Sequence, residues 1–246
     1  MPSLNAVLFD MDGTLVDTEG LWWEAAELEA ARLGLALGEQ DRPFVLGCAV
    51  QDTAEHLLRR SAQQVSPTAL AAALDRRFTA LVRDGVVPLP GALDLLDRLN
   101  AAGVSTGLVS ASPRQVVDPV LDVLGRHRFS VSRAAGETPR TKPAADPYLA
   151  AAAALGVPPD SCVAVEDSPT GIASAEAAGC AVVAVPSFLP VRSAPGRTVV
   201  RSLLEVDLPL LRRAVTAGAA AVNRQSFDHS LTGDGGGPAA DWGPSR

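Results

Sequence analysis

Aromatic residues and cysteines are scarce in this 246-residue chain, which limits how its core can be built. Aromatic residues make up 4% of the sequence and hydrophobic residues 47%, so the core must consist mainly of alanine, valine and leucine. The three cysteines, Cys48, Cys162 and Cys180, are odd in number and form no CxxC pair. This pattern argues against a disulfide framework and favours buried free thiols in a reducing cytoplasm.

Basic clusters and long apolar runs are also missing. The net charge is −7 and the isoelectric point is about 5.0, so nucleic acid and anionic membranes are poor partners. No apolar stretch reaches the length of a membrane span, and Asp10 interrupts the first apolar run, which argues against a secretory signal. We therefore expect a cytoplasmic protein that binds neither nucleic acid nor membranes. The sequence does not specify an oligomeric state, and a monomer is the default expectation.

The most informative segment that is present covers residues 7–19. Its apolar residues 7–9 lead directly into Asp10 and Asp12, and Gly13 ends the run. Carboxylates at the end of an apolar strand lie at the edge of a sheet, where open α/β folds bind ligands. Two acids so close together do not both ionise comfortably unless a cation or a proton lies between them. The segment predicts a Mg²⁺ site, a nucleophile with its acid/base partner, or both.

Strand patterns and helix patterns alternate through most of the chain. Apolar runs predict strands at residues 6–9, 104–109, 162–165 and 181–185, and a weaker one at 129–131. Helix starts are expected where an N-cap residue precedes proline, at Ser112, Asp146 and Ser168, and helix ends at Gly103, Gly156 and Gly179. Near-continuous apolar strands that alternate with helices predict an α/β fold with a doubly wound parallel sheet.

Residues 18–87 have helix patterns and no convincing strand. Apolar residues follow helical spacing at Leu21, Ala25, Leu28, Ala31 and Leu35, with the intervening glutamates turned mostly outward. Asp52 with Glu55 has the form of a capping pair for a second helix, and Ser66 before Pro67 opens a third. The pattern predicts an all-helical lid, or cap, inserted into the α/β fold.

The expected organisation therefore has three parts. Residues 1–17 and 88–222 form the α/β core, and residues 18–87 form the helical cap, joined to the core by hinges near residues 17–20 and 85–90. Residues 223–246 are rich in glycine, serine and aspartate, so we expect a disordered tail.

Three later segments carry groups that a phosphate or a metal ion would need. The apolar strand near residues 104–109 leads into Ser110, a small hydroxyl at the sheet edge. Lys142 lies in a loop and offers a cation to balance carboxylates and a phosphate. Another apolar strand runs into Glu166 and Asp167, whose hard oxygen ligands suit Mg²⁺.

In this order, the segments resemble the four motifs of the haloacid dehalogenase superfamily, whose members are mostly phosphatases and phosphomutases. Residues 10–14 (Asp-Met-Asp-Gly-Thr) resemble the first motif, Ser110 the second, Lys142 the third and residues 165–171 the fourth. The insertion after the first motif is similar to the helical-cap branch that includes β-phosphoglucomutase-like proteins and sugar-phosphate phosphatases.

The resemblance implies a role for each residue. Asp10 would be the nucleophile that forms an aspartyl-phosphate intermediate, and Asp12 the general acid and base. Ser110, the backbone amide of Ala111 and Lys142 would bind the phosphate. A Mg²⁺ cofactor would be held by oxygens of four residues: Asp10, Asp12 through its backbone carbonyl, Asp167, and Glu166 through water.

Departures from the mutase pattern favour hydrolysis. By count from Asp10, Trp22 stands where the mutase has a hinge histidine, and Val50 where it has an arginine for a second phosphate. We therefore expect a Mg²⁺-dependent phosphatase for a small phosphomonoester, a sugar or polyol phosphate first, with Trp22 and Val50 in the cap setting specificity.

Two alternatives remain open. One is a β-phosphoglucomutase-like phosphotransferase, and the other is a binding protein without catalysis on the same scaffold. A dehalogenase is a weaker reading, since that branch of the superfamily does not keep the second acid represented here by Asp12.

Overall fold

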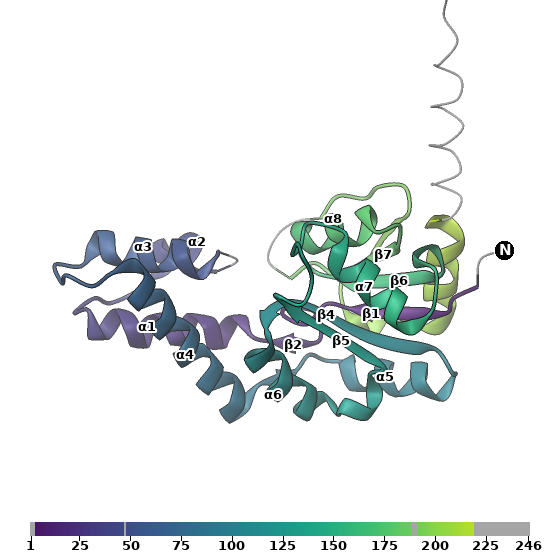
Figure 1. Ribbon diagram of the computed structural model, residues 1–246, viewed down its shortest axis with the longest axis horizontal. Coiled ribbons are helices and arrows are strands. Elements are labelled where there is room, and N and C mark those ends of the chain that lie inside the picture. Colours follow the sequence, from purple (N-terminus) through teal and green to yellow (C-terminus); the bar gives the residue numbers. More distant parts are fainter. Residues whose placement is uncertain (1–2, 47, 188–190, 219–246) are drawn as a thin grey trace, which may run out of the picture.

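A six-stranded parallel sheet forms the centre of the larger part of the molecule (Figure 1). The computed structural model describes residues 3–46, 48–187 and 191–218. The strands lie in the order β5-β4-β1-β6-β7-β8. The central strand β1 therefore has β4 and β5 on one side and β6, β7 and β8 on the other. Their bounds are β1 (Ala6–Phe9), β4 (Ser105–Pro113), β5 (Val131–Ala135), β6 (Cys162–Glu166), β7 (Ala181–Ala184) and β8 (Arg197–Val199). The expected doubly wound α/β fold is confirmed.

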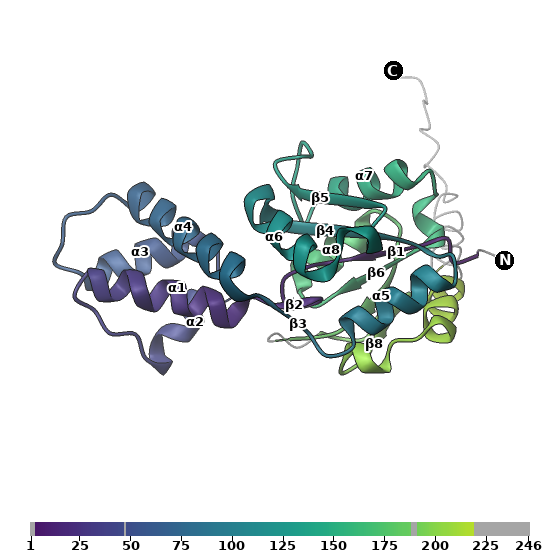
Figure 2. The same ribbon diagram turned by 90° about the horizontal axis from the view of Figure 1, so that it is seen from below.

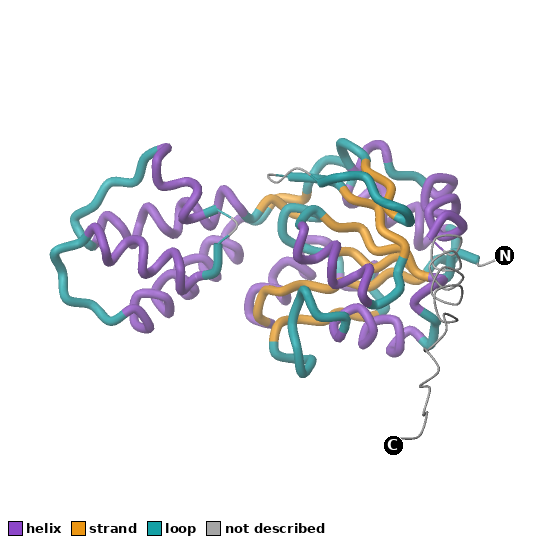
Figure 3. The backbone as a smooth tube through the Cα atoms, turned by 90° about the horizontal axis from the view of Figure 1, so that it is seen from above, coloured by secondary structure: helices purple, strands orange, loops and turns teal. Residues whose placement is uncertain are grey.

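Helices cover both faces of this sheet (Figure 3). Alternate residues of β1 separate two apolar cores, as the two-residue period of a strand requires. Val7 and Phe9 pack with α5 (Ala92–Ala101), α6 (Arg114–Leu124) and the helical residues 208–218. Ala6 and Leu8 pack with α7 (Asp146–Leu155) and α8 (Pro169–Ala177). Short 3₁₀ helices occupy Arg126–Arg128, Pro159–Ser161 and Leu203–Glu205.

Four α-helices form a separate unit beside the sheet (Figures 1 and 2). They are α1 (Glu19–Arg32), α2 (Arg42–Val45), α3 (Val50–Arg60) and α4 (Pro67–Gly85), with a 3₁₀ turn at Glu39–Asp41. A small antiparallel ribbon of β2 (Val16–Asp17) and β3 (Val87–Pro88) lies where the chain enters and leaves the unit. The segments that enter and leave the helical unit are therefore hydrogen-bonded to each other. The ribbon connects this helical unit, residues 19–85, to the α/β part of the chain just after the carboxyl end of β1.

The expected apolar stripe on α1 is only partly correct, since Ala25 is buried but Leu28 and Ala31 are exposed. The buried residues are Ala25, Ala26, Glu29 and Ala30, whereas Leu28 is 40% exposed. Small alanines let α1 pack closely against α4, and the buried Glu29 is paired with Arg77 of α4 at 3.3 Å. An ion pair between helices thus overrides the hydrophobic pattern.

Several expected element boundaries also differ. Neither Asp52 nor Glu55 caps α3, which begins at Val50 after an uncapped Ala49. Ser112 is not an N-cap, because β4 continues through it, and Asp146 is the first residue of its helix rather than its cap. The weak strand at 129–131 overlaps β5 only at Val131, and the short strands β2, β3 and β8 were not expected. Ser66 and Ser168 do cap their helices, as they accept hydrogen bonds from Ala69 N and Gly171 N.

Among the described residues, none of the helices combines the length and the apolarity that crossing a bilayer requires. The tail expected at residues 223–246 lies outside the described residues.

Candidate active site

The ends of three neighbouring strands bring the expected site residues together. Phe9, the last residue of β1, is level with Leu108 of β4 on one side and Val165 of β6 on the other. Asp10 continues this register, since its backbone N–H donates to the carbonyl of Val165 at 2.9 Å. The carboxyl ends of strands on both sides of β1 therefore meet beside Asp10, at the position where doubly wound sheets bind ligands.

Three carboxylates cluster at this edge. Asp10, Glu166 and Asp167 each offer an oxygen within 4.8 Å of the others, and all three are buried. Lys142 Nζ donates to Asp10 Oδ1 and to Glu166 Oε1, each at 2.6 Å. Tyr148 also donates to Glu166 Oε1 at 2.6 Å. One amine therefore faces three acids, and the surplus of oxygen donors and negative charge suits a divalent cation.

The titration behaviour of the cluster reflects this surplus. Burial and the charge of Asp10 raise the pKa of Asp167 to about 8, although Ser187 donates a hydrogen bond to its Oδ2 at 2.5 Å. Burial alone would lower the pKa of Lys142, but the charges of Asp10 and Glu166 outweigh it and raise that pKa. Lys142 is thus held as a cation, but its single positive charge does not balance the three carboxylates.

The side chain of Asp12 is held by three hydroxyl groups and is not one of the three clustered acids. Its Oδ1 accepts from Thr18 at 2.8 Å, and its Oδ2 accepts from Ser112 at 2.8 Å and Ser110 at 3.1 Å. Burial, with the charge of Asp10, raises the pKa of Asp12 despite these three donors. A carboxyl group oriented this way can exchange a proton with a neighbouring group.

Gly13 allows the loop after β1 to approach the acid cluster. Its φ is +77°, and a Cβ at this position would lie 2.3 Å from Asp167 Oδ2. Any side chain here would strain the backbone and displace the carboxylate.

A cavity of about 730 Å³ joins the sheet edge to the helical unit. Asp10, Asp12, Lys142 and Asp167 line one end. Trp22 and Val50 line the other, and Ala111 also reaches the cavity. A second cavity of the same volume, beside α6, contains none of the acid cluster and is not the site.

Trp22 is fixed by two contacts within the helical unit. Its indole Nε1 donates to the carbonyl of Val45 at 2.8 Å. Its ring meets Phe78 of α4 edge to face, with centroids 5.4 Å apart. The position is therefore a rigid apolar wall rather than a proton-transferring one.

Five residues that hydrogen-bond to the acids were not predicted as site residues from the sequence. One is Ser168, which donates to Glu166 Oε2 at 3.3 Å. Thr18 and Ser112 follow the first and second motifs closely, so their hydroxyls were a usable signal. Tyr148, the only tyrosine, and Ser187 lie far along the chain from the acids they contact, and only the fold brings them there.

The family model of haloacid dehalogenase-like hydrolases matches residues 4–179. The chain belongs to this family. It is 36% identical to hexitol phosphatase A of Escherichia coli over 82% of this chain and 88% of that protein. It is 34% identical to protein CbbY of Rhodobacter capsulatus over 75% of this chain and 86% of that protein.

A solved structure agrees with this assignment. CbbY from Rhodobacter sphaeroides in complex with xylulose-(1,5)bisphosphate superimposes with a TM-score of 0.71 at 27% identity. The match covers 85% of this chain and 99% of that one. The resemblance inferred from the four motifs is therefore confirmed, and the buried acid cluster fits the divalent metal that this family generally uses.

Proposed function

We propose that this hydrolase removes phosphate from a small phosphorylated metabolite, with Asp10 as the nucleophile. The observation that carries the proposal is the arrangement around Asp10: its carboxylate contacts Lys142 Nζ at 2.6 Å and lines a cavity shared with Asp12. Similarity to a hexitol phosphatase and to CbbY supports the same chemistry on small phosphorylated compounds.

Asp10 and Asp12 divide the reaction between them. A carboxylate oxygen of Asp10 attacks phosphorus, the bond from phosphorus to the substrate oxygen breaks, and Asp12 gives its proton to that oxygen. The raised pKa of Asp12 favours the protonated form that this step needs. Water then attacks phosphorus, Asp12 takes up a proton from it, and Asp10 is released with inorganic phosphate.

Lys142, Ser110 and the backbone amide of Ala111 supply donors to the transferred phosphate. Lys142 also offsets the charge of Asp10 as the phosphate arrives. Ser110 lies next to Asp12, to which its hydroxyl donates a hydrogen bond at 3.1 Å.

A metal ion fits the remaining carboxylates, and we assign it as Mg²⁺. Asp10, the backbone carbonyl of Asp12 and Asp167 would hold it, with Glu166 acting through water. The surplus of buried acids, which raises the pKa of Asp167, is the observation that supports this assignment. When bound, the ion supplies positive charge beside the phosphate.

The helical unit serves as a cap in this proposal. Residues 18–87 form the cap, and residues 1–17 and 88–222 form the core. Trp22 and Val50 shape the part of the cavity that receives the organic group. Lys142 alone contributes an amine or guanidinium to the described lining, so a sugar or polyol monophosphate fits better than a mutase's bisphosphate intermediate. The protein acts as a cytoplasmic monomer without nucleic-acid or membrane partners.

A substrate panel tests the proposal. Purified protein is assayed for phosphate release from p-nitrophenyl phosphate, hexose and hexitol monophosphates and phosphoglycolate, with Mg²⁺ and with a chelator. We expect Mg²⁺-dependent release, greatest for the hexitol or hexose monophosphate. Isomerisation of a hexose 1-phosphate without phosphate release would instead identify a mutase, and no turnover of any compound would contradict the proposal.

A further inference from the structure

Among its described lining residues, the end of the cavity formed by the helical unit has two carboxyl groups and no cation. Its lining there includes Glu19 of α1, Asp75 of α4, and residues 48–51 at the start of α3. The amine of Lys142, the single cation in the described lining, lies at the opposite end and is bound by Asp10 and Glu166. A substrate group that enters the helical end therefore meets carboxyl groups with no cation beside them in the described lining.

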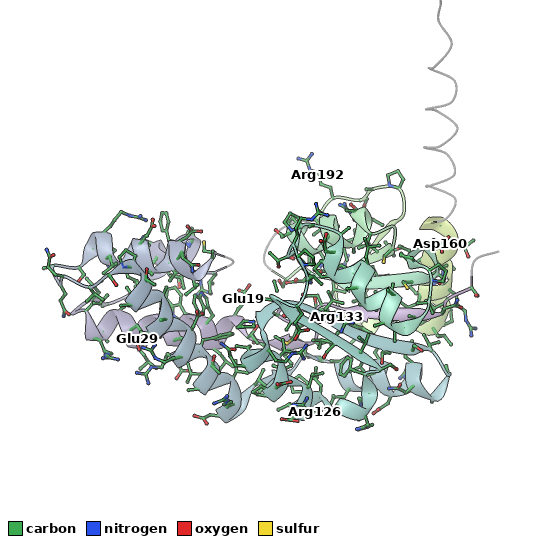
Figure 4. All side chains as sticks on the ribbon, in the orientation of Figure 1. Glu19, Glu29, Arg126, Arg133, Asp160 and Arg192 are labelled. Carbon is green, nitrogen blue, oxygen red and sulfur yellow. The ribbon has the colours of Figure 1, made fainter. Side chains whose placement is uncertain are left out.

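Helical spacing places both acids beside the aromatic wall. Glu19 lies three residues before Trp22 on α1, and Asp75 lies three residues before Phe78 on α4, so each acid shares a face with its aromatic neighbour. Trp22 and Phe78 are themselves in contact, which joins the two helices at this point. In Figure 4, Glu19 lies at the junction between the helical unit and the sheet.

Glu19 has an unused hydrogen-bond acceptor. Its Oε2 is buried and has no hydrogen-bond partner. Burial, together with the charge of Asp17, raises the pKa of this carboxyl to about 7. Burial also raises the pKa of Asp75. A buried oxygen without a donor is unfavourable. Glu19 lines the cavity, so a rotation of its side chain would bring this oxygen to the hydroxyl groups of a ligand.

Arg42 is the cation that acts on Glu19, and it is already engaged. Its charge lowers the pKa of Glu19 less than burial and Asp17 raise it. Its guanidinium pairs with Glu39 at 3.4 Å and lies 5.4 Å from the centroid of the Trp23 ring. Arg42 does not line the cavity, so it leaves the helical end acidic.

We infer that Glu19 and Asp75 determine specificity: they accept hydrogen bonds from the hydroxyl groups of the substrate and exclude compounds with a second phosphate. The inference rests on the proposed phosphatase function and narrows its substrate to a polyhydroxy monophosphate. A second phosphate placed beside these acids without a neutralising cation would be repelled, so repulsion would select against bisphosphates. The chain would thus differ from the CbbY relative that was crystallised with a bisphosphate.

The test compares a hexitol 6-phosphate with a hexose 1,6-bisphosphate in the full-length enzyme. The variants are Glu19→Gln and Asp75→Asn, which keep size and remove charge. Matched controls are Glu27→Gln on α1 and Asp84→Asn on α4, since both acids are exposed and lie outside the cavity. The readout is the ratio of kcat/KM for the bisphosphate to kcat/KM for the monophosphate.

We expect the wild type and both controls to prefer the monophosphate, and each charge-removing variant to raise the ratio about tenfold. An unchanged ratio in both variants would overturn the inference. A wild type that prefers the bisphosphate would also overturn it, and loss of that preference in Arg42→Ala would identify Arg42 as the phosphate ligand.

A binding measurement separates this inference from the proposed function. Calorimetric titration of the two compounds into Asp10→Asn, with and without Glu19→Gln, needs no turnover. If the wild type hydrolyses neither compound, the proposed function fails, and the binding ratio still decides the inference. Weaker monophosphate binding together with stronger bisphosphate binding in the double variant supports it, and equal changes for both compounds contradict it.

Discussion

Gly171 packs directly against the carboxylate of Glu166. A Cβ at position 171 would lie 2.0 Å from both Oε1 and Oε2 of Glu166, which is far inside any permitted contact. Glu166 in turn holds Lys142 at 2.6 Å, and Lys142 holds Asp10 at the same distance. The absent side chain at the start of α8 therefore helps to set the position of the nucleophile.

Gly171→Ala should impair catalysis through this contact. The methyl group must push Glu166 away, and Lys142 loses one of its two carboxylate partners. Changes to residues that support metal and phosphate ligands cost about 10–100-fold in activity or metal affinity, and we expect a loss in that range. Gly85→Ala, in a helix with open space around its Cβ, is the control. Equal kcat/KM in Gly171→Ala and wild type would show that Glu166 does not position the site.

Asp12→Asn should separate the two halves of the reaction. Nitrophenolate leaves without a proton, so p-nitrophenyl phosphate should still phosphorylate the enzyme, whereas hydrolysis of the intermediate lacks its base. We expect a burst of one nitrophenolate per enzyme followed by turnover about 10²–10⁴-fold slower than wild type. Stopped-flow absorbance measures both phases. Full steady-state turnover by Asp12→Asn would remove Asp12 from the acid/base role.

Asp167→Ala should raise the metal requirement without unfolding the protein. The change removes one hard oxygen ligand and relieves repulsion with Asp10, which contributes to the raised pKa of Asp167. In a titration of activity against Mg²⁺, we expect the half-saturating concentration to rise at least about tenfold. Asp160→Ala is the control, because Asp160 is exposed and lies at the far side of the sheet (Figure 4). An unchanged titration curve would place the metal elsewhere.

Asp41 anchors the chain between α1 and α2, and its removal should destabilise the helical unit. It is buried, with His56 Nε2 at 2.8 Å, the Gly38 N–H at 2.9 Å and a contact from Arg60. Burial alone would raise the pKa of Asp41, but these partners outweigh it and lower that pKa. Asp41→Asn leaves two of the donors poorly paired, so we expect a loss of about 1–3 kcal/mol near pH 7.

The pH dependence of that loss gives a second check. A carboxyl whose pKa is lowered by folding stabilises the protein above its unfolded pKa, and this stabilisation disappears as the pH falls through the folded pKa. The stability difference between wild type and Asp41→Asn should therefore shrink as the pH falls below about pH 4. Glu55→Gln, in an exposed pair with Arg59, should cost less than about 1 kcal/mol. A difference that grows towards low pH would contradict this account.

The parts of the site that the sequence could predict are those set by strand ends. Asp10, Ser110 and Glu166 each follow or end an apolar run, and parallel strands bring their carboxyl ends to one edge. Lys142 could be placed only through the order of the motifs, because nothing local distinguishes it from a surface lysine. The structure brings its amine to 2.6 Å from two acids.

The features that could not be predicted from the sequence depend on contacts between distant segments. Ser112 has the local form of an N-cap, yet β4 continues through it and its hydroxyl bonds to Asp12. Glu29 has the polarity of an exposed residue, yet it is buried and pairs with the partly exposed Arg77 of another helix. The edge strand β8 has few apolar residues, and β7 is what makes it a strand.

Covalent trapping shows whether Asp10 is the residue that becomes phosphorylated. Asp12→Asn is mixed with p-nitrophenyl phosphate and Mg²⁺, quenched in acid, digested with pepsin and examined by mass spectrometry. We expect one phosphoryl group on the peptide that contains Asp10, removable by hydroxylamine and absent from the double variant with Asp10→Asn. A phosphoryl group that resists hydroxylamine on Ser110 or Ser112, or turnover by Asp10→Asn close to that of wild type, would contradict this expectation.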